Sequence, residues 1–82
     1  MEKSEILNEV NLIFQEVLDD QNIIINYDSS SENVDDWDSL AHIQLIVAIE
    51  KKFKVKFTAK EMVEWKNVGE MIENILNKIN TN

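Results

Sequence analysis

Residues able to do chemistry gather in one short segment, Asp35-Asp36-Trp37-Asp38-Ser39-Leu40, and the single histidine, His42, follows it closely. A serine, a histidine and an aspartate this close suggest a hydrolase. On a helix, Ser39 and His42 would share a face. A catalytic triad, however, needs its acid on the far side of the histidine, whereas Asp38 adjoins the serine. No glycine elbow precedes Ser39 and no oxyanion hole is evident. We therefore expect no catalytic residue and a structural role for His42 near the core.

Ser39 suits a different chemistry, the attachment of a phosphate ester. It stands at the start of an apolar helical segment, where a hydroxyl is exposed. A phosphate there would meet free backbone N–H groups and the positive end of the helix dipole. Asp35, Asp36 and Asp38 oppose that anion, but could help a partner enzyme position a divalent metal during attachment. The acids do not match a calcium-binding loop, because Gln44 occupies the place of its last glutamate. We expect no metal site.

Four helices should position this segment, because the chain has no proline and one glycine, fewer turn residues than a sheet needs. The first is indicated by apolar residues at three- and four-residue spacing after a cap at Ser4. The last two are indicated by capping boxes of Thr58 with Glu61 and of Asn67 with Glu70. The predicted fold is all-α, a small four-helix bundle forming a single domain over residues 1–82. The expected helices span about 4–18, 39–53, 59–65 and 68–80.

A long loop, residues 19–38, should join the first two helices, because it shows no helical period. Loops of this length are usually functional or disordered. We expect four apolar side chains to fasten it to the core and a serine run to face water. The four are Ile23, Ile24, Ile25 and Tyr27, and the run is 29–31.

The segment 52–57 alternates lysine with apolar residues, which is a strand pattern. It could pair with residues 23–27 as a short ribbon. We favour a helix end followed by an extended link, with Phe53, Val55 and Phe57 inward and the lysines in water.

The second helix carries two apolar stripes. Leu45 and Ile49, with Phe53, form the expected core stripe, whereas Leu40, Ile43 and Val47 lie on another face. Either the long loop covers this second stripe, or the stripe is exposed and binds a partner. The sequence leaves both readings open.

Composition narrows the classes of function. The chain has 82 residues, sixteen acids, eight lysines and no arginine, for a net charge of −8. Residues 1–40 hold eleven of the acids and one lysine, so the N-terminal half is strongly acidic. Nucleic-acid binding is therefore not expected. The absence of cysteine excludes disulfides and thiolate metal sites. No apolar run suits a membrane span and no signal peptide is evident, so we expect a cytoplasmic monomer.

Asp38-Ser39-Leu40, at the start of an apolar helix and after a long acidic loop, resembles the attachment motif of the acyl carrier protein family. The similarity runs over about residues 4–80. It implies 4′-phosphopantetheine on Ser39, with Asp38 and Leu40 completing the motif, and acyl groups held as thioesters on the thiol of that arm. It implies a phosphopantetheinyl transferase and acyl-loading and acyl-processing enzymes as partners. It also implies a cleft for the arm or acyl chain beside the third helix, where Met62 and Trp65, both bulky, indicate a narrow pocket and a short or polar cargo.

Departures from the family pattern indicate a carrier dedicated to one biosynthetic pathway rather than to general fatty acid synthesis. Trp37 to Leu40 is similar to the Trp-Asp-Ser-Leu form of specialised carriers, and Asp36 replaces a glycine usual in fatty-acid members. The second helix, usually acidic in the family, has Ala41, Gln44 and Lys51 at positions expected to be exposed. We expect partner recognition by an acidic and apolar set of residues: Asp35, Asp36, Leu40, Ile43, Gln44 and Val47. The alternative is a small acidic helical adaptor that binds protein partners without a prosthetic group.

Overall fold

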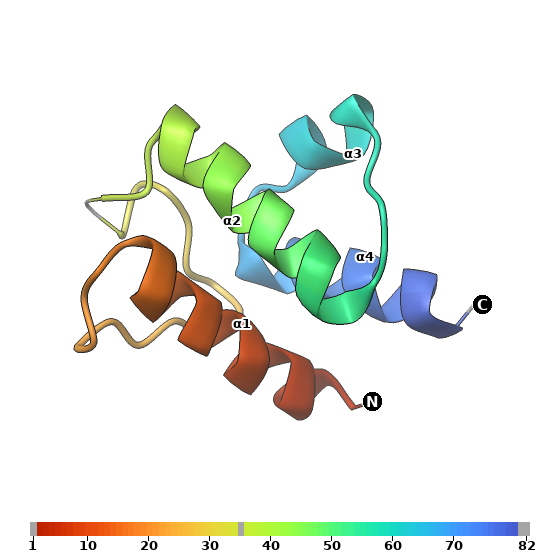
Figure 1. Ribbon diagram of the computed structural model, residues 1–82, viewed down its shortest axis with the longest axis horizontal. Helices are drawn as coiled ribbons and strands as arrows, with labels where there is room; N and C mark the ends of the chain where they lie inside the picture. Colours follow the sequence, from red (N-terminus) through yellow and green to blue (C-terminus); the bar gives the residue numbers. More distant parts are fainter. Residues whose placement is uncertain (1, 35, 81–82) are drawn as a thin grey trace.

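The computed structural model describes residues 2–34 and 36–80, and over these ranges the chain forms four α-helices and no strand. They are α1 (Lys3–Val17), α2 (Ser39–Phe53), α3 (Ala59–Glu64) and α4 (Val68–Asn80). α1 and α2 lie side by side and run in opposite directions, with α4 behind them and the short α3 to one side (Figure 1). This confirms the predicted all-α fold. Within the described residues, no helix is long and apolar enough to cross a membrane.

The core forms where α1, α2 and α4 turn their apolar stripes toward one another. Full burial of one such side chain contributes about 1.5–3 kcal/mol to folding. α3 adds no buried residue to this core. The fully buried side chains are Ile6, Val10 and Phe14 of α1, Leu45 and Ile49 of α2, and Val68, Met71, Ile72 and Ile75 of α4.

The helix ends agree with the predicted ends to within one residue. α1 begins before Ser4, so the predicted serine cap was wrong: Glu2 is the cap, and its N–H donates to Oε1 of Glu5 at 3.1 Å. Two glutamates near this end also suit the positive end of the helix dipole. α3 begins after Thr58, as predicted, with its capping box to Glu61.

The long loop is fastened to α1 by two side-chain amides one helical turn apart. Asn11 Oδ1 accepts from the N–H of Ile25 at 2.7 Å, and Gln15 Nε2 donates to the carbonyl of Ile23 at 3.0 Å. Ile25 is buried and Ile23 partly buried, as expected, but Ile24 is 86% exposed. Adjacent side chains of an extended segment point to opposite sides, so Ile24 turns outward. The prediction that it anchors the loop was wrong.

The loop also caps the start of α4. The N–H of Val68 donates to the Ser29 carbonyl and the N–H of Gly69 to the Tyr27 carbonyl, both at 2.8 Å. Ser29 is buried and its Oγ accepts from the N–H of Asn26 at 2.9 Å, which corrects the prediction that the serine run as a whole faces water. Tyr27 is exposed and contributes its backbone instead of a buried ring. Gly69 is required here, because a Cβ would lie 2.9 Å from the Tyr27 oxygen.

The link from α2 to α3 is extended, and the ribbon alternative is not seen over the described residues. α2 ends at Phe53, and Lys54 caps it with a φ of 57°, in the left-handed region. Val55 and Phe57 are buried, Phe53 is half-buried and the intervening lysines are exposed. The alternation therefore reflects one side of the link packing on the core.

Candidate functional site

Ser39 is the first residue of α2, and Asp38 determines that position. Asp38 Oδ1 accepts a hydrogen bond from the N–H of Ala41 at 2.8 Å, which makes Asp38 the N-cap of the helix. Ser39 and Leu40 are both exposed. The cap therefore places the Ser39 hydroxyl at the positive end of the α2 dipole and open to solvent.

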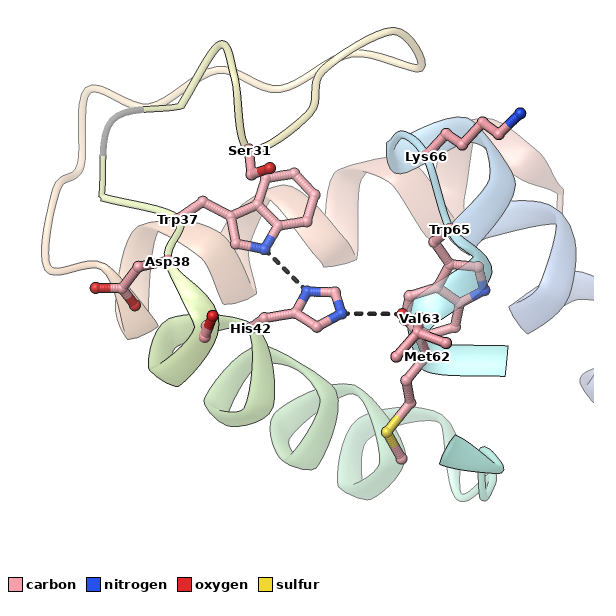
Figure 2. A pocket seen from close by; sticks show the side chains of 9 residues that line it. Ser31, Trp37, Asp38, His42, Met62, Val63, Trp65 and Lys66 are labelled. Carbon is pink, nitrogen blue, oxygen red and sulfur yellow. Dashed lines mark hydrogen bonds between the residues drawn. The ribbon is translucent and has the colours of Figure 1, made fainter. Parts of the chain in front are cut away.

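A cleft of about 590 Å³ opens beside Ser39, between the end of the long loop, the first turns of α2 and the end of α3 (Figure 2). Both residues predicted to line an arm or acyl cleft, Met62 and Trp65, are in its walls. The full lining is Ser31, Trp37, Asp38, Ser39, His42, Met62, Val63, Trp65 and Lys66.

His42 ties two walls of this cleft together. Trp37 Nε1 donates to His42 Nδ1 at 3.0 Å, and His42 Nε2 lies 3.2 Å from the Met62 carbonyl oxygen (Figure 2). An indole N–H can only donate and a carbonyl can only accept. The two partners therefore assign His42 as the neutral imidazole with its hydrogen on Nε2. The ring joins the loop just ahead of Ser39 to the end of α3.

Aromatic rings continue this connection into the core. The Trp37 ring meets Phe14 edge-on at a centroid distance of 4.9 Å and stacks on His42 at 5.8 Å. On the other side Trp65 meets His42 at 6.0 Å and Phe57 at 4.9 Å, again edge-on. Such pairs contribute about 0.5–1.5 kcal/mol each beyond the area they bury. The inner wall of the cleft is therefore an extension of the core.

These contacts also decide against a hydrolase. Both ring nitrogens of His42 are engaged away from Ser39, and the Asp38 carboxylate caps α2 instead of orienting the imidazole. Ser39 consequently has neither His42 nor Asp38 arranged as its base. The predicted structural role of His42 is confirmed.

α3, which forms the outer wall, is held to α4 by a polar network around Glu61. Glu61 Oε1 accepts from the Thr58 N–H at 2.8 Å and from Lys78 Nζ at 3.1 Å, and Oε2 accepts from Asn74 Nδ2 at 2.9 Å. The pKa of Glu61 is lowered to about 2, first by the hydrogen bond from Thr58, then by the hydrogen bond from Asn74 and the charge of Lys78. Because Asn74 and Lys78 belong to α4, Glu61 fastens α3 to that helix.

The second stripe of α2, Leu40, Ile43 and Val47, is exposed, and we call it the apolar stripe. The exposed fractions are 66%, 59% and 44%, so the long loop does not cover it. Three exposed apolar side chains in line along one helix face form an unpartnered patch.

Of the other predicted recognition residues, two are exposed and one lies outside the described residues. Gln44 and Asp36 are exposed, and Gln44 lies beside the apolar stripe because it follows Leu40 by one helical turn. Ala41, expected at an exposed position, is buried at 7% because it faces the core. Asp35 lies outside the described residues.

Sequence reasoning missed four residues of the cleft: Ser31, Trp37, Val63 and Lys66. Only Trp37 left a usable signal, because an indole donor just ahead of a helix and a histidine in its first turns can pair. The others lie on a loop and at the end of a short helix, where no periodicity predicts the direction of a side chain.

Comparison of this chain with known proteins identifies its family. The family model described as "Phosphopantetheine attachment site" matches residues 8–75, a range that contains Ser39 and the whole cleft. An acyl carrier protein of Cyanidium caldarium is 35% identical over 78 residues, which are 95% of this chain and 91% of that protein. The chain belongs to the acyl carrier protein family. Its fold matches the solution structure of a holo acyl carrier protein from Geobacter metallireducens with a TM-score of 0.85 and 36% identity, covering 92% of this chain and 86% of that one.

Members of the acyl carrier protein family carry groups for other proteins and are not catalysts, which agrees with the unavailability of His42 and Asp38 to Ser39. As an acyl carrier protein, this chain uses covalently attached 4′-phosphopantetheine and works with a phosphopantetheinyl transferase and acyl-processing enzymes. Two surfaces of this acyl carrier protein, the cleft and the apolar stripe, do not yet have an assigned function.

Proposed function

We propose that Ser39 carries the 4′-phosphopantetheine arm and that the chain presents acyl thioesters to the enzymes of one specialised pathway. The observation that carries this proposal is the position of Ser39. Its hydroxyl is exposed at the first residue of a helix, is flanked by Asp38 and Leu40, and borders a cleft. When bound, the arm supplies the thiol that carries the acyl group.

The surroundings of Ser39 suit a phosphodiester. The start of α2 favours an anion through its dipole and its free N–H groups. Asp38 supports the attachment point indirectly, because its carboxylate is used as the helix cap. Asp36, also exposed, adds negative charge. Its role in the proposal is recognition by the partner that installs the arm.

The cleft beside Ser39 is proposed to shelter the arm or the acyl chain. Trp37, His42, Met62 and Trp65 give it an apolar and aromatic wall, and its volume of about 590 Å³ falls within the usual range of ligand sites. The wall containing Trp37 is fixed to Phe14 of the core, so the cleft cannot deepen on that side. This supports a short or polar cargo, such as a small acyl group with a hydrogen-bonding substituent.

The apolar stripe supports a dedicated pathway. A partner enzyme that covers Leu40, Ile43 and Val47 recognises apolar contacts, with the exposed Gln44 beside them on the helix. Interfaces of this kind gain specificity from a few buried apolar anchors surrounded by polar residues. An enzyme adapted to this surface has a different binding surface from an enzyme that binds a uniformly acidic helix.

Intact-mass measurement tests the proposal. The purified protein, incubated with coenzyme A, magnesium and a phosphopantetheinyl transferase, should gain one phosphopantetheine. Ser39→Ala should gain none and keep its helical circular dichroism spectrum. Ser31→Ala is the matched control, since Ser31 borders the same cleft, and it should be modified like the wild type. If several broad transferases leave the wild type unmodified, the adaptor without a prosthetic group becomes the better description.

A further inference from the structure

A second cleft lies at the C-terminal end of α2, away from Ser39. Its volume is about 390 Å³, and its walls come from the last turns of α2 and the link that follows. We call it the lysine cleft, because it gathers three of the eight lysines of the chain. The lining residues are Val47, Glu50, Lys51, Lys54, Val55 and Lys56.

The positive charge of the lysine cleft is not neutralised within the described parts of the chain. Lys51, Lys54 and Lys56 are exposed, and the ion pairs found there are made by other lysines. Glu50 is the one acid in the wall, and its Oε2 accepts a hydrogen bond from the N–H of Phe57 at 2.9 Å. Three lysines against one glutamate leave a positive site on a chain whose net charge is −8.

Helix stability explains only part of this arrangement. A lysine in the last turn, such as Lys51, is favoured by the negative end of the helix dipole. Lys54 has a φ of 57°, a conformation in which glycine or asparagine would cost less. Lys56 lies beyond the helix end. The dipole does not account for these two lysines.

The lysine cleft continues the apolar stripe along the same face of α2. Leu40, Ile43, Val47 and Lys51 follow one another at spacings of three or four residues, so they lie in one line on the helix, and Lys54 caps its end. Val47 belongs to both features. From Ser39 to Phe53 the helix rises by about 21 Å at about 1.5 Å per residue. One face of a standard interface, about 800 Å² per partner, spans that length.

We propose that the lysine cleft binds an acidic side chain of the enzyme that loads the acyl group, while apolar side chains of that enzyme cover the apolar stripe. This inference rests on the proposed function, because it requires a loading enzyme. An acid in the cleft faces three lysines at once and is partly shielded from solvent by the walls. Opposite charges placed in this way steer association and set the register of docking. An enzyme with a basic rim at the same place would be repelled.

Steady-state kinetics with charge-reversed carriers test the inference. The loading enzyme is isolated from the source organism by its ability to form a thioester on the holo protein. Lys51→Glu and Lys56→Glu should each raise the KM for the holo carrier by about 5-fold, with kcat unchanged, because attraction becomes repulsion. Lys60→Glu is the matched control, an exposed lysine on α3 outside both clefts, and it should change KM by less than about 2-fold.

A carbodiimide, which joins an amine to a carboxylate in contact, supplies the second measurement. The cross-linked peptides should contain Lys51, Lys54 or Lys56 bonded to an aspartate or glutamate of the enzyme. Equal KM values for all three variants, or a lower KM for Lys51→Glu, would overturn the inference. If Ser39 gains phosphopantetheine and is loaded, but Lys51→Glu and Lys56→Glu have the same KM as the wild-type carrier, this inference alone fails. If no phosphopantetheine is added, the proposed function fails and the inference falls with it.

Discussion

Replacing Glu61 by glutamine should loosen α3 and remove part of the acid sensitivity of folding. The carboxylate of Glu61 accepts hydrogen bonds from Thr58, Asn74 and Lys78, and these partners lower its pKa from 4.5 to about 2. A glutamine side chain keeps one acceptor oxygen but loses the charge. Thr58, Asn74 and Lys78 would then compete for a weaker acceptor.

The magnitude follows from linkage between protonation and folding. A shift from 4.5 to about 2 corresponds to at most about 3 kcal/mol, at about 1.4 kcal/mol per pKa unit. The Glu61 side chain is 24% exposed, so water and salt screen part of this. We expect Glu61→Gln to reduce the free energy of unfolding by about 1–2 kcal/mol at pH 7.

The sign of the pH dependence follows from the lowered pKa. The folded state binds the proton less tightly than the unfolded state, so the contribution of Glu61 is complete above pH 4.5 and disappears as the pH falls toward 2. Urea unfolding followed by circular dichroism at pH 7, 4.5, 3 and 2 measures it. The difference between wild type and Glu61→Gln should shrink across this range. Glu64→Gln, an exposed position on the same helix, is the control. A difference for Glu61→Gln that matches the control, or that stays constant with pH, would refute the reasoning.

Three further experiments test other parts of the structure. Gly69→Ala should lower the free energy of unfolding by about 1–2 kcal/mol although alanine is the better helix former, because its Cβ would press on the Tyr27 carbonyl; a stabilised variant in urea unfolding would contradict the close approach. Trp37→Phe and His42→Gln, measured alone and together, should show a coupling energy of about 0.5–1.5 kcal/mol, and strict additivity would mean that their hydrogen bond contributes nothing. Val47→Asp should slow acyl loading while changing the melting temperature by less than about 3 °C, and a loss of several kcal/mol would instead show that Val47 belongs to the core.

Helix positions could be predicted from the sequence because their signals are local. The period of apolar residues in α1 and α4 and the capping box of Thr58 with Glu61 each depend on neighbours within four positions. The error at Ser4 has the same origin, since Glu2 and Ser4 both suit a helix start and the choice depends on one hydrogen bond.

Burial in the long loop could not be predicted in the same way. Whether Ile24 or Ile25 points inward depends on which backbone N–H meets Asn11, a residue fourteen positions earlier. The burial of Ser29 depends on the start of α4, almost forty residues later. These are tertiary contacts that leave no local pattern.

For the candidate site, the motif in the sequence predicted Ser39 as the attachment point, but the sequence did not predict how the cleft beside it is built. The exposed state of the apolar stripe was one of two open readings, and only the course of the loop decided it. The link between Trp37 and Met62 through His42 required knowing both hydrogen-bond partners of one imidazole.

The absence of fully buried residues in α3 has a consequence for the size of the cleft. α3 contributes no residue to the buried core, and Met62 at the cleft is only partly buried. Segments with few buried contacts open locally at a smaller free-energy cost than the whole domain unfolds. Amide hydrogens of α3 should therefore exchange with solvent earlier than those of α1 or α4. A displacement of α3 alone would therefore widen the cleft while the packing of α1, α2 and α4 stays intact.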